Sequence, residues 1–95
     1  MKFLLEYGIS KETIEELKAT LEDSTIFYFL CSKENVKQVI EYLKSIHVEV
    51  IDKLLINRLE LFFLPVDKIK ECFEAYNIEV LVQLMNDDIN VLNNI

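Results

Sequence analysis

The residues of this chain that could carry chemistry begin with one histidine and two cysteines. A metal site would require His47 to join Cys31 and Cys72. Zinc sites show short spacings such as Cys-x-x-Cys, and these three residues share no such motif. We therefore expect no metal site. We expect both cysteines to be reduced thiols buried in the core of a cytosolic protein, and His47 to close a helix.

Clustered carboxylates could act as general acids and bases or bind a divalent cation. Three groups are present: Glu12, Glu15 and Glu16; Glu71 and Glu74; and Asp87 and Asp88. Each group has the spacing of a polar helix face or lies at a helix start, which explains it without chemistry. The chain also has no Gly-rich phosphate loop and no nucleophile beside a base. We expect no catalytic residue, no cofactor and no enzyme.

Basic side chains gather in the middle of the chain. Three of them fall on one face of a predicted helix and two follow: Lys33, Lys37 and Lys44, then Lys53 and Arg58. Such a stripe could contact a nucleic-acid backbone. Acidic residues are interleaved with it: Glu34, Glu41, Glu49 and Asp52. The net charge of −7 also disfavours contact with phosphates or anionic membranes. A solvated face of mixed charge is the favoured interpretation, so nucleic-acid and membrane partners are not expected.

The composition indicates the elements that must position these residues. The chain has 95 residues, 52% of them hydrophobic, with one Gly and one Pro. So few turn-forming residues favour an all-α fold with short joints in a single domain, residues 1–95. Its uninterrupted apolar runs, such as Ile26–Cys31, are too short to cross a bilayer. Richness in Ile, Asn, Lys and Glu without Trp suggests a bacterial source with an AT-rich genome.

An internal repeat organises the chain. Val36–Phe62 recurs thirty residues later, without a gap, as Val66–Leu92, and 13 of the 27 aligned pairs are apolar on both sides. Chance would give roughly a quarter, so we infer a helical-repeat stack. Two copies of about 30 residues are clear, and the first is degenerate. The copies span approximately residues 1–31, 32–63 and 64–95.

Local signals predict the helices of each copy. We expect a short helix ending at Gly8, and then a helix capped by Ser10. The segment Thr25–Cys31 suits either one or two helical turns or a buried strand. Ser32 should cap the next helix, whose inward stripe is Val36, Val39, Ile40, Leu43 and Ile46.

The following elements are predicted in the same way. A second helix points Val50, Ile51, Leu54 and Leu55 inward, and a short apolar piece covers Leu59–Leu64. Pro65 starts the third copy, whose stripe is Val66, Ile69, Phe73 and Tyr76. A closing helix carries Val80, Leu81, Leu84 and Met85, and a last segment spans Ile89–Leu92. Gly8, His47 and Asn77 take matching positions, and all three tolerate positive φ.

The repeat resembles that of the mitochondrial transcription termination factor (mTERF) family. The resemblance lies in Leu43-Lys44-Ser45-Ile46-His47-Val48, followed by Ile51 and by Leu54-Leu55. Similar steps occur at Leu5–Ser10 and at Phe73–Ile78. The resemblance implies a stack of triangular helical units and a nucleic-acid groove. The chain departs from the family pattern, because Asn57-Arg58 and Asp87-Asp88 stand where family repeats usually carry a proline.

The closing helix is apolar nearly all round, since Val82 replaces the Asp52 of the preceding copy. A terminal repeat should have a polar outer face. Either Ile89–Ile95 folds back over this helix or another chain covers it. The candidate interface comprises Ile78, Leu81, Val82 and Met85.

The function expected from the sequence is that of a small cytoplasmic protein-interaction module acting through its C-terminal copy. Self-association, as in a homodimer, is the simplest form of this hypothesis. The alternative is a nucleic-acid-binding regulator of the termination-factor type, with contacts through Lys33, Lys37 and Lys44.

Overall fold

The computed structural model describes residues 2–88, and this part of the chain is all-α, as predicted. Its helices follow in this order: α1 (Phe3–Glu6), α2 (Lys11–Thr20), α3 (Asp23–Cys31), α4 (Lys33–Ser45), α5 (Ile51–Asn57), the 3-10 helix η1 (Leu59–Phe63), α6 (Val66–Glu74) and α7 (Ile78–Asp87). No strand occurs among the described residues. The segment predicted over Ile89–Leu92 lies outside them.

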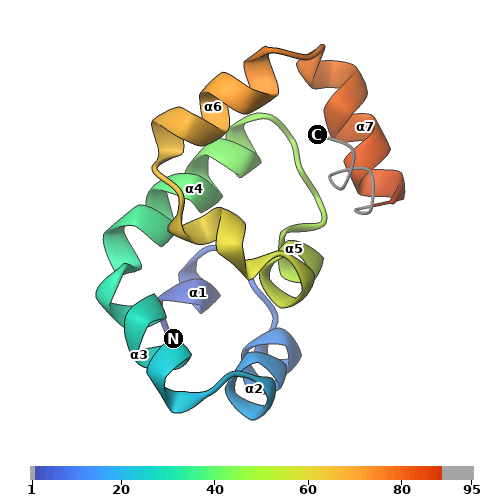
Figure 1. The fold of residues 1–95 in the computed structure, drawn as a ribbon. Coiled ribbons are helices and arrows are strands. Elements are labelled where there is room, and N and C mark those ends of the chain that lie inside the picture. Colours follow the sequence, from blue (N-terminus) through green and yellow to red (C-terminus); the bar gives the residue numbers. More distant parts are fainter. Residues whose placement is uncertain (1, 89–95) are drawn as a thin grey trace.

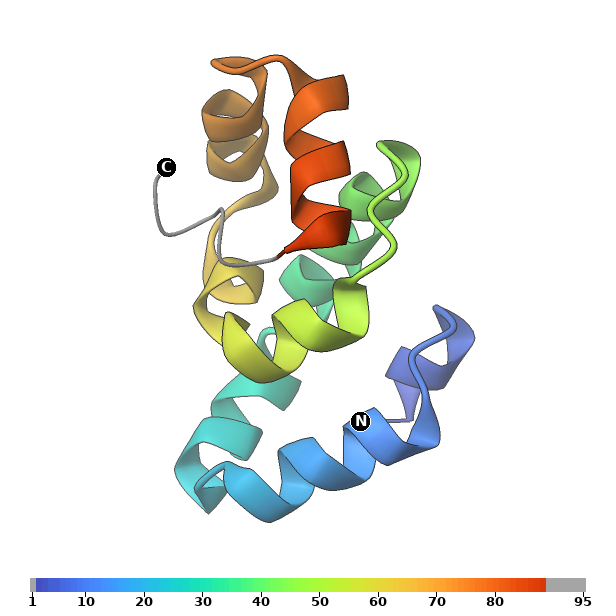
Figure 2. The same cartoon turned by 90° about the vertical axis from the view of Figure 1, so that its right-hand side faces the viewer.

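The helices form an elongated stack with extents of 36 × 24 × 24 Å. Helices α2 and α3 lie at one end and α6 and α7 at the other, with α4 running between them (Figure 1). The view turned by 90° shows the same order from end to end (Figure 2). We call residues 2–31, 32–63 and 64–88 the N-terminal, middle and C-terminal thirds. The number of repeat copies remains a prediction from the sequence.

Helix α4 supplies the centre of the core. Four members of its predicted stripe, Val36, Val39, Ile40 and Leu43, are each at most 1% exposed, and the fifth, Ile46, is half-buried at the end of the helix. The helix packs against α3, which precedes it, and against η1 and α6, which follow it. It therefore contacts elements of all three thirds of the chain. Truncating one such side chain to alanine costs about 2–5 kcal/mol, because the surrounding residues fill the cavity only in part.

Two helices end in the same left-handed turn. Gly8 has φ +82° and His47 has φ +68°, as predicted for helix-closing residues. After each of them the chain reaches back, since the amide of Ile9 donates to the Leu4 carbonyl (3.2 Å) and that of Val48 to the Leu43 carbonyl (3.0 Å). These bonds and the buried apolar pair at each turn form a Schellman motif. The motif satisfies carbonyl groups that the helix end would otherwise leave unpaired.

Two of the predicted helix ends differ in the structure. Asn77 does not close α6, because its φ is −73° and its side chain instead accepts a hydrogen bond from the Val80 amide at the start of α7. Ser32 does not cap α4 with its side chain. Its own amide donates to the carbonyls of Tyr28 and Phe29, so α3 runs into α4 with hardly a break and needs no capping group.

The segment Thr25–Cys31 is helical, which excludes the buried strand as its structure. Only Phe29 of α3 is buried, because just one side of this apolar helix faces the core. The prediction that both cysteines are buried is therefore wrong: Cys31 and Cys72 are free and exposed. On α6 the buried stripe is Ile69 and Phe73, and Cys72 lies beside this stripe.

The left-handed turns can be tested by exchanging their residues. We expect His47→Gly to raise the free energy of unfolding by about 0.5–1 kcal/mol, because a residue with Cβ pays about 1–2 kcal/mol in this conformation. Gly8→Ala should lower it by about 1 kcal/mol. A Cβ at Gly8 would meet only the Lys44 Nζ at 3.7 Å, so the loss comes from φ and not from a clash. Urea unfolding measures both changes, and a His47→Gly variant less stable than the parent would contradict this account.

Candidate functional site

The N-terminal and middle thirds are joined by a carboxylate. Asp52 Oδ2, on α5, accepts hydrogen bonds from the Ser10 amide (3.0 Å) and from the Thr13 hydroxyl (2.8 Å). Ser10 also caps α2, as predicted, because its hydroxyl accepts from the Thr13 amide (3.2 Å). The sequence interpretation counted Asp52 among solvated charges, whereas the structure places it, half-buried, in the contact between α2 and α5.

These hydrogen bonds change the acidity of Asp52. Burial alone would raise the pKa of this carboxyl group. The hydrogen bonds from Ser10 and Thr13 favour the charged form and together outweigh burial, so the pKa of Asp52 is lowered. The carboxylate is therefore charged at neutral pH and holds the start of α2 against α5.

The middle and C-terminal thirds are joined in a related way. Asn86, on α7, accepts a hydrogen bond from the Glu49 amide (2.8 Å) and donates one to the His47 carbonyl (3.3 Å). In both junctions the satisfied amide lies two residues after the left-handed residue, at Ser10 after Gly8 and at Glu49 after His47. A side chain from the next third supplies the acceptor each time.

These junctions fix which side of α7 faces the core. Val82 lies one turn before Asn86 on the same side, so this side faces the middle third. Leu81, Val82 and Met85 are 6%, 7% and 0% exposed, and Ile78 is half-buried. The candidate interface predicted at these residues is thus corrected for three of its four members. Val82 is covered from within the chain. The matching residue, Asp52, is also partly covered from within the chain.

The exposed apolar side chains of this end belong to another set. Tyr76, Val80 and Leu84 are 49%, 51% and 46% exposed, and we call them the C-terminal face. Together with Asn77 and Leu81 they line a shallow cavity of about 150 Å³. Tyr76 had been assigned to the inward stripe of its helix, and Val80 and Leu84 were left out of the candidate interface.

Comparison with the middle third shows what is unusual about this face. The matching positions, thirty residues earlier, are Ile46, Val50 and Leu54, of which the first two are half-buried. Leu54 is 0% exposed, whereas Leu84 is 46% exposed. The repeat itself was a signal that could have located the C-terminal face, because positions covered in one copy lack cover in the last.

A second group of exposed apolar side chains lies on and beside α3. Phe27, Tyr28, Leu30 and Leu64 are 70%, 58%, 42% and 42% exposed. The Tyr28 ring contacts the Phe63 ring edge to face, with centroids 4.9 Å apart. This group lies outside the C-terminal face, and it serves below as a control surface.

The lysines of the predicted basic stripe pack against aromatic rings. The Lys33 ammonium lies 5.6 Å from the centre of the Phe3 ring, and that of Lys44 lies 5.7 Å from the Tyr7 ring. Such cation–π contacts contribute about 0.5–1 kcal/mol each at exposed sites. Lys37 is half-buried. Two of the three lysines thus help to hold α1 on α4.

An acidic residue completes this α1–α4 contact. The Tyr7 hydroxyl donates a hydrogen bond to Glu41 Oε1 (2.9 Å), and because only the neutral phenol can donate it, this bond raises the pKa of Tyr7. The face that carries the lysines therefore also carries a carboxylate, as the interpretation of mixed charge predicts.

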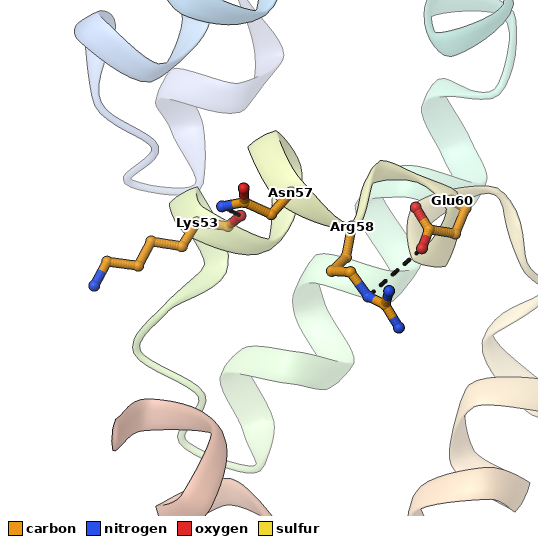
Figure 3. Close-up of polar contacts among 4 residues, drawn as sticks. All are labelled: Lys53, Asn57, Arg58 and Glu60. Atoms are coloured by element: carbon orange, nitrogen blue, oxygen red, sulfur yellow. Dashed lines mark hydrogen bonds and ion pairs between the residues drawn. The ribbon is translucent and has the colours of Figure 1, made fainter. Parts of the chain in front are cut away.

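The two basic residues further along the chain do not extend this stripe. Figure 3 shows Lys53 and Arg58 pointing away from each other. Arg58 Nε lies 3.5 Å from Glu60 Oε1, an ion pair without hydrogen-bond geometry, and Asn57 Nδ2 donates to the Lys53 carbonyl (3.0 Å). Neither arrangement forms a continuous basic surface.

A polar cleft of about 320 Å³ lies between α4 and α6. Its lining residues are Gln38, Glu41, Tyr42, Ser45, Val66 and Lys70. Burial, with a smaller effect from Glu74, raises the pKa of Tyr42, whose hydroxyl is buried without a hydrogen-bond partner. The phenol is therefore neutral at physiological pH and is no activated nucleophile. Within residues 2–88 no group of three or more His, Cys, Asp or Glu side chains could hold a metal ion.

Comparisons of the chain with models of protein families, with curated proteins and with solved structures found no match. Among the described residues, no helix is both long enough and apolar enough to span a membrane.

The Asp52 junction gives a prediction about pH. A folded-state pKa below the unfolded value of about 3.9 means that the stabilisation is fully present above that value and is lost as pH falls through the folded pKa. We expect Asp52→Asn to lower the free energy of unfolding by about 1–2 kcal/mol at pH 7, because a neutral amide oxygen is a weaker acceptor for these hydrogen bonds than the carboxylate. Urea unfolding of both proteins at several pH values should show the difference shrinking below about pH 4. An equal difference at pH 7 and pH 3 would contradict the assignment.

Proposed function

We propose that the protein is a protein-interaction module, not an enzyme, and that its C-terminal face is the binding surface. The observation that carries this proposal is the contrast between Leu54, fully buried, and the matching Leu84, nearly half exposed. Because matching positions in stacked helices have similar surroundings, an uncovered apolar position at the end of the stack is a place where a partner can add cover.

Burial of the C-terminal face by a partner would be energetically favourable. Full burial of one large apolar side chain contributes about 1.5–3 kcal/mol, so covering three half-exposed ones contributes about 1 kcal/mol each. Isolated exposed apolar residues are ordinary, whereas contiguous ones mark binding surfaces more often. Tyr76, Val80 and Leu84 line one cavity together and are therefore contiguous.

The net charge and the exposed thiols support a protein partner and a reducing compartment. A net charge of −7 favours protein partners over phosphate backbones, and two of the stripe lysines already contact aromatic rings. The nucleic-acid function implied by the mTERF resemblance is therefore not adopted. Free and exposed cysteines suit a reducing compartment, and we place the protein in the cytoplasm.

The proposal is tested by charging the C-terminal face. Tagged full-length protein is incubated with nuclease-treated lysate of the source organism, and bound proteins are quantified by mass spectrometry. We expect Val80→Asp combined with Leu84→Asp to abolish capture of specific partners, because a partner would have to bury two carboxylates. Both residues are exposed, so the fold should survive, and circular dichroism with thermal unfolding verifies this.

The control is Phe27→Asp, which introduces a carboxylate at a more exposed apolar residue outside the face. This variant should keep the partners. Equal capture by the double variant and the parent would overturn the proposal. Capture of nucleic acid without nuclease, with protein partners lost on digestion and affinity falling steeply with salt, would support the termination-factor alternative instead.

A further inference from the structure

A small apolar hollow lies at the end of the stack opposite the C-terminal face. It measures about 190 Å³ and is lined by Lys2, Leu5, Lys11, Ile14, Glu15 and Lys18. We call it the N-terminal hollow. Helix α2 lies at the end of the molecule away from α7 in both views (Figures 1 and 2). An apolar cavity of about 150 Å³ holds one benzene ring, so this hollow has room for one large apolar side chain.

The hollow opens to the outside of the stack. Thr13 faces α5, because its hydroxyl donates a hydrogen bond to Asp52. Lys11 lies two residues before Thr13 and Glu15 two residues after it, so each is turned by about 160° from the side that faces α5. Leu5, on α1, is 49% exposed and lines the hollow. A partner therefore has access to the apolar floor of the hollow.

The lining of the hollow is basic, although the N-terminal third as a whole is acidic. Residues 2–31 include three lysines and six carboxylates. All three lysines line the hollow, whereas Glu15 is the one carboxylate among the described residues that does so. Glu12 and Glu16 lie about 100° and 140° around α2 from Lys11. At physiological salt the Debye length is about 8 Å, so the lysines that a ligand contacts outweigh the more distant carboxylates.

These lysines have no partner within the part of the chain that the structure describes. None of Lys2, Lys11 and Lys18 forms an ion pair or lies over an aromatic ring. The ammonium groups of Lys33 and Lys44, in contrast, lie over the rings of α1. The positive charges around the hollow are therefore available to a ligand.

The spacing of the lysines indicates how charge should be arranged in this ligand. Lys11 and Lys18 are seven residues apart on α2, which separates them by about 10 Å along the helix axis. Ile14 lies between them, so an apolar group in the hollow has a lysine on each side. Residues three apart in an extended peptide are separated by the same distance, about 10 Å. A fatty acid has one carboxylate and would leave one of these lysines without a counter-ion.

We propose that the N-terminal hollow binds an acidic segment of a partner protein, in which one large apolar side chain lies between carboxylates. The apolar side chain fills the hollow, and the carboxylates pair with Lys11 and Lys18. This surface is a second binding site, at the other end of the stack from the C-terminal face, and it does not depend on the proposed function. With one site at each end, the module would bring two proteins together.

The test uses a synthetic peptide, Gly-Glu-Glu-Phe-Glu-Glu-Gly, in which Phe lies between carboxylates three residues apart. Isotope-labelled full chain is titrated with this peptide at physiological salt, and binding is followed through the backbone amide signals in two-dimensional NMR spectra. We expect saturable shifts at residues 2–18 and none on α7. A peptide with Gly in place of Phe, or with Gln in place of every Glu, should bind at least about tenfold more weakly.

Variants of the full chain test the lysines. Lys11→Glu with Lys18→Glu should weaken binding at least about tenfold, because attraction becomes repulsion. The matched control is Lys53→Glu with Lys68→Glu, which changes the net charge equally at two exposed lysines outside the hollow and should change the dissociation constant by less than about twofold. Glu15→Lys should tighten binding by about twofold or more. All five positions are exposed, so the fold should survive.

Three results would contradict this inference. Equal weakening by the hollow variant and by its charge-matched control would show that net charge governs binding. Octanoate, an apolar chain with one carboxylate, bound as tightly as the peptide would show a site for a single carboxylate. The absence of saturable shifts at residues 2–18 at millimolar peptide would exclude the site, and it would leave the proposed function of the C-terminal face unaffected.

Discussion

The fold depends on satisfying the backbone amides that follow its left-handed turns. A Schellman motif pairs the carbonyls of the helix that ends, but it gives no partner to the amides two residues later. Asp52 serves the amide of Ser10, and Asn86 serves that of Glu49. Because each acceptor comes from a helix of the next third, one local requirement fixes how successive thirds are placed. The burial of the α4 side chains supplies most of the stability of the fold. The side chains of Asp52 and Asn86 fix the relative positions of successive thirds.

Much of the fold could be predicted from the sequence because its signals are local. The stripe of α4, the Ser10 cap and the turns at Gly8 and His47 each depend on a few neighbouring residues, and all were confirmed. The predictions for Asn77 and Ser32 were wrong because a local signal does not decide between several structures. Asn and Ser can each end a helix, cap one or continue through it.

The candidate site could not be predicted because exposure depends on neighbours distant in sequence. A helix that is apolar all round, such as α3 or α7, does not indicate which of its sides is covered. The interface was therefore placed at Ile78, Leu81, Val82 and Met85, three of which are buried, and the exposed Val80 and Leu84 were left out of it. The same limit applies to Cys31 and Cys72, because apolar character gave no information on the side they occupy.

The exposure of Cys31 and Cys72 also determines how the molecule can be observed. Their free thiols lie on α3 and α6, in different thirds of the chain, and neither side chain contributes to the core. Thiol-reactive fluorophores could therefore be attached at either position without opening the fold. A donor on α3 and an acceptor on α6 would report the separation of the two helices within one molecule, and dyes carried by separate molecules would report their proximity.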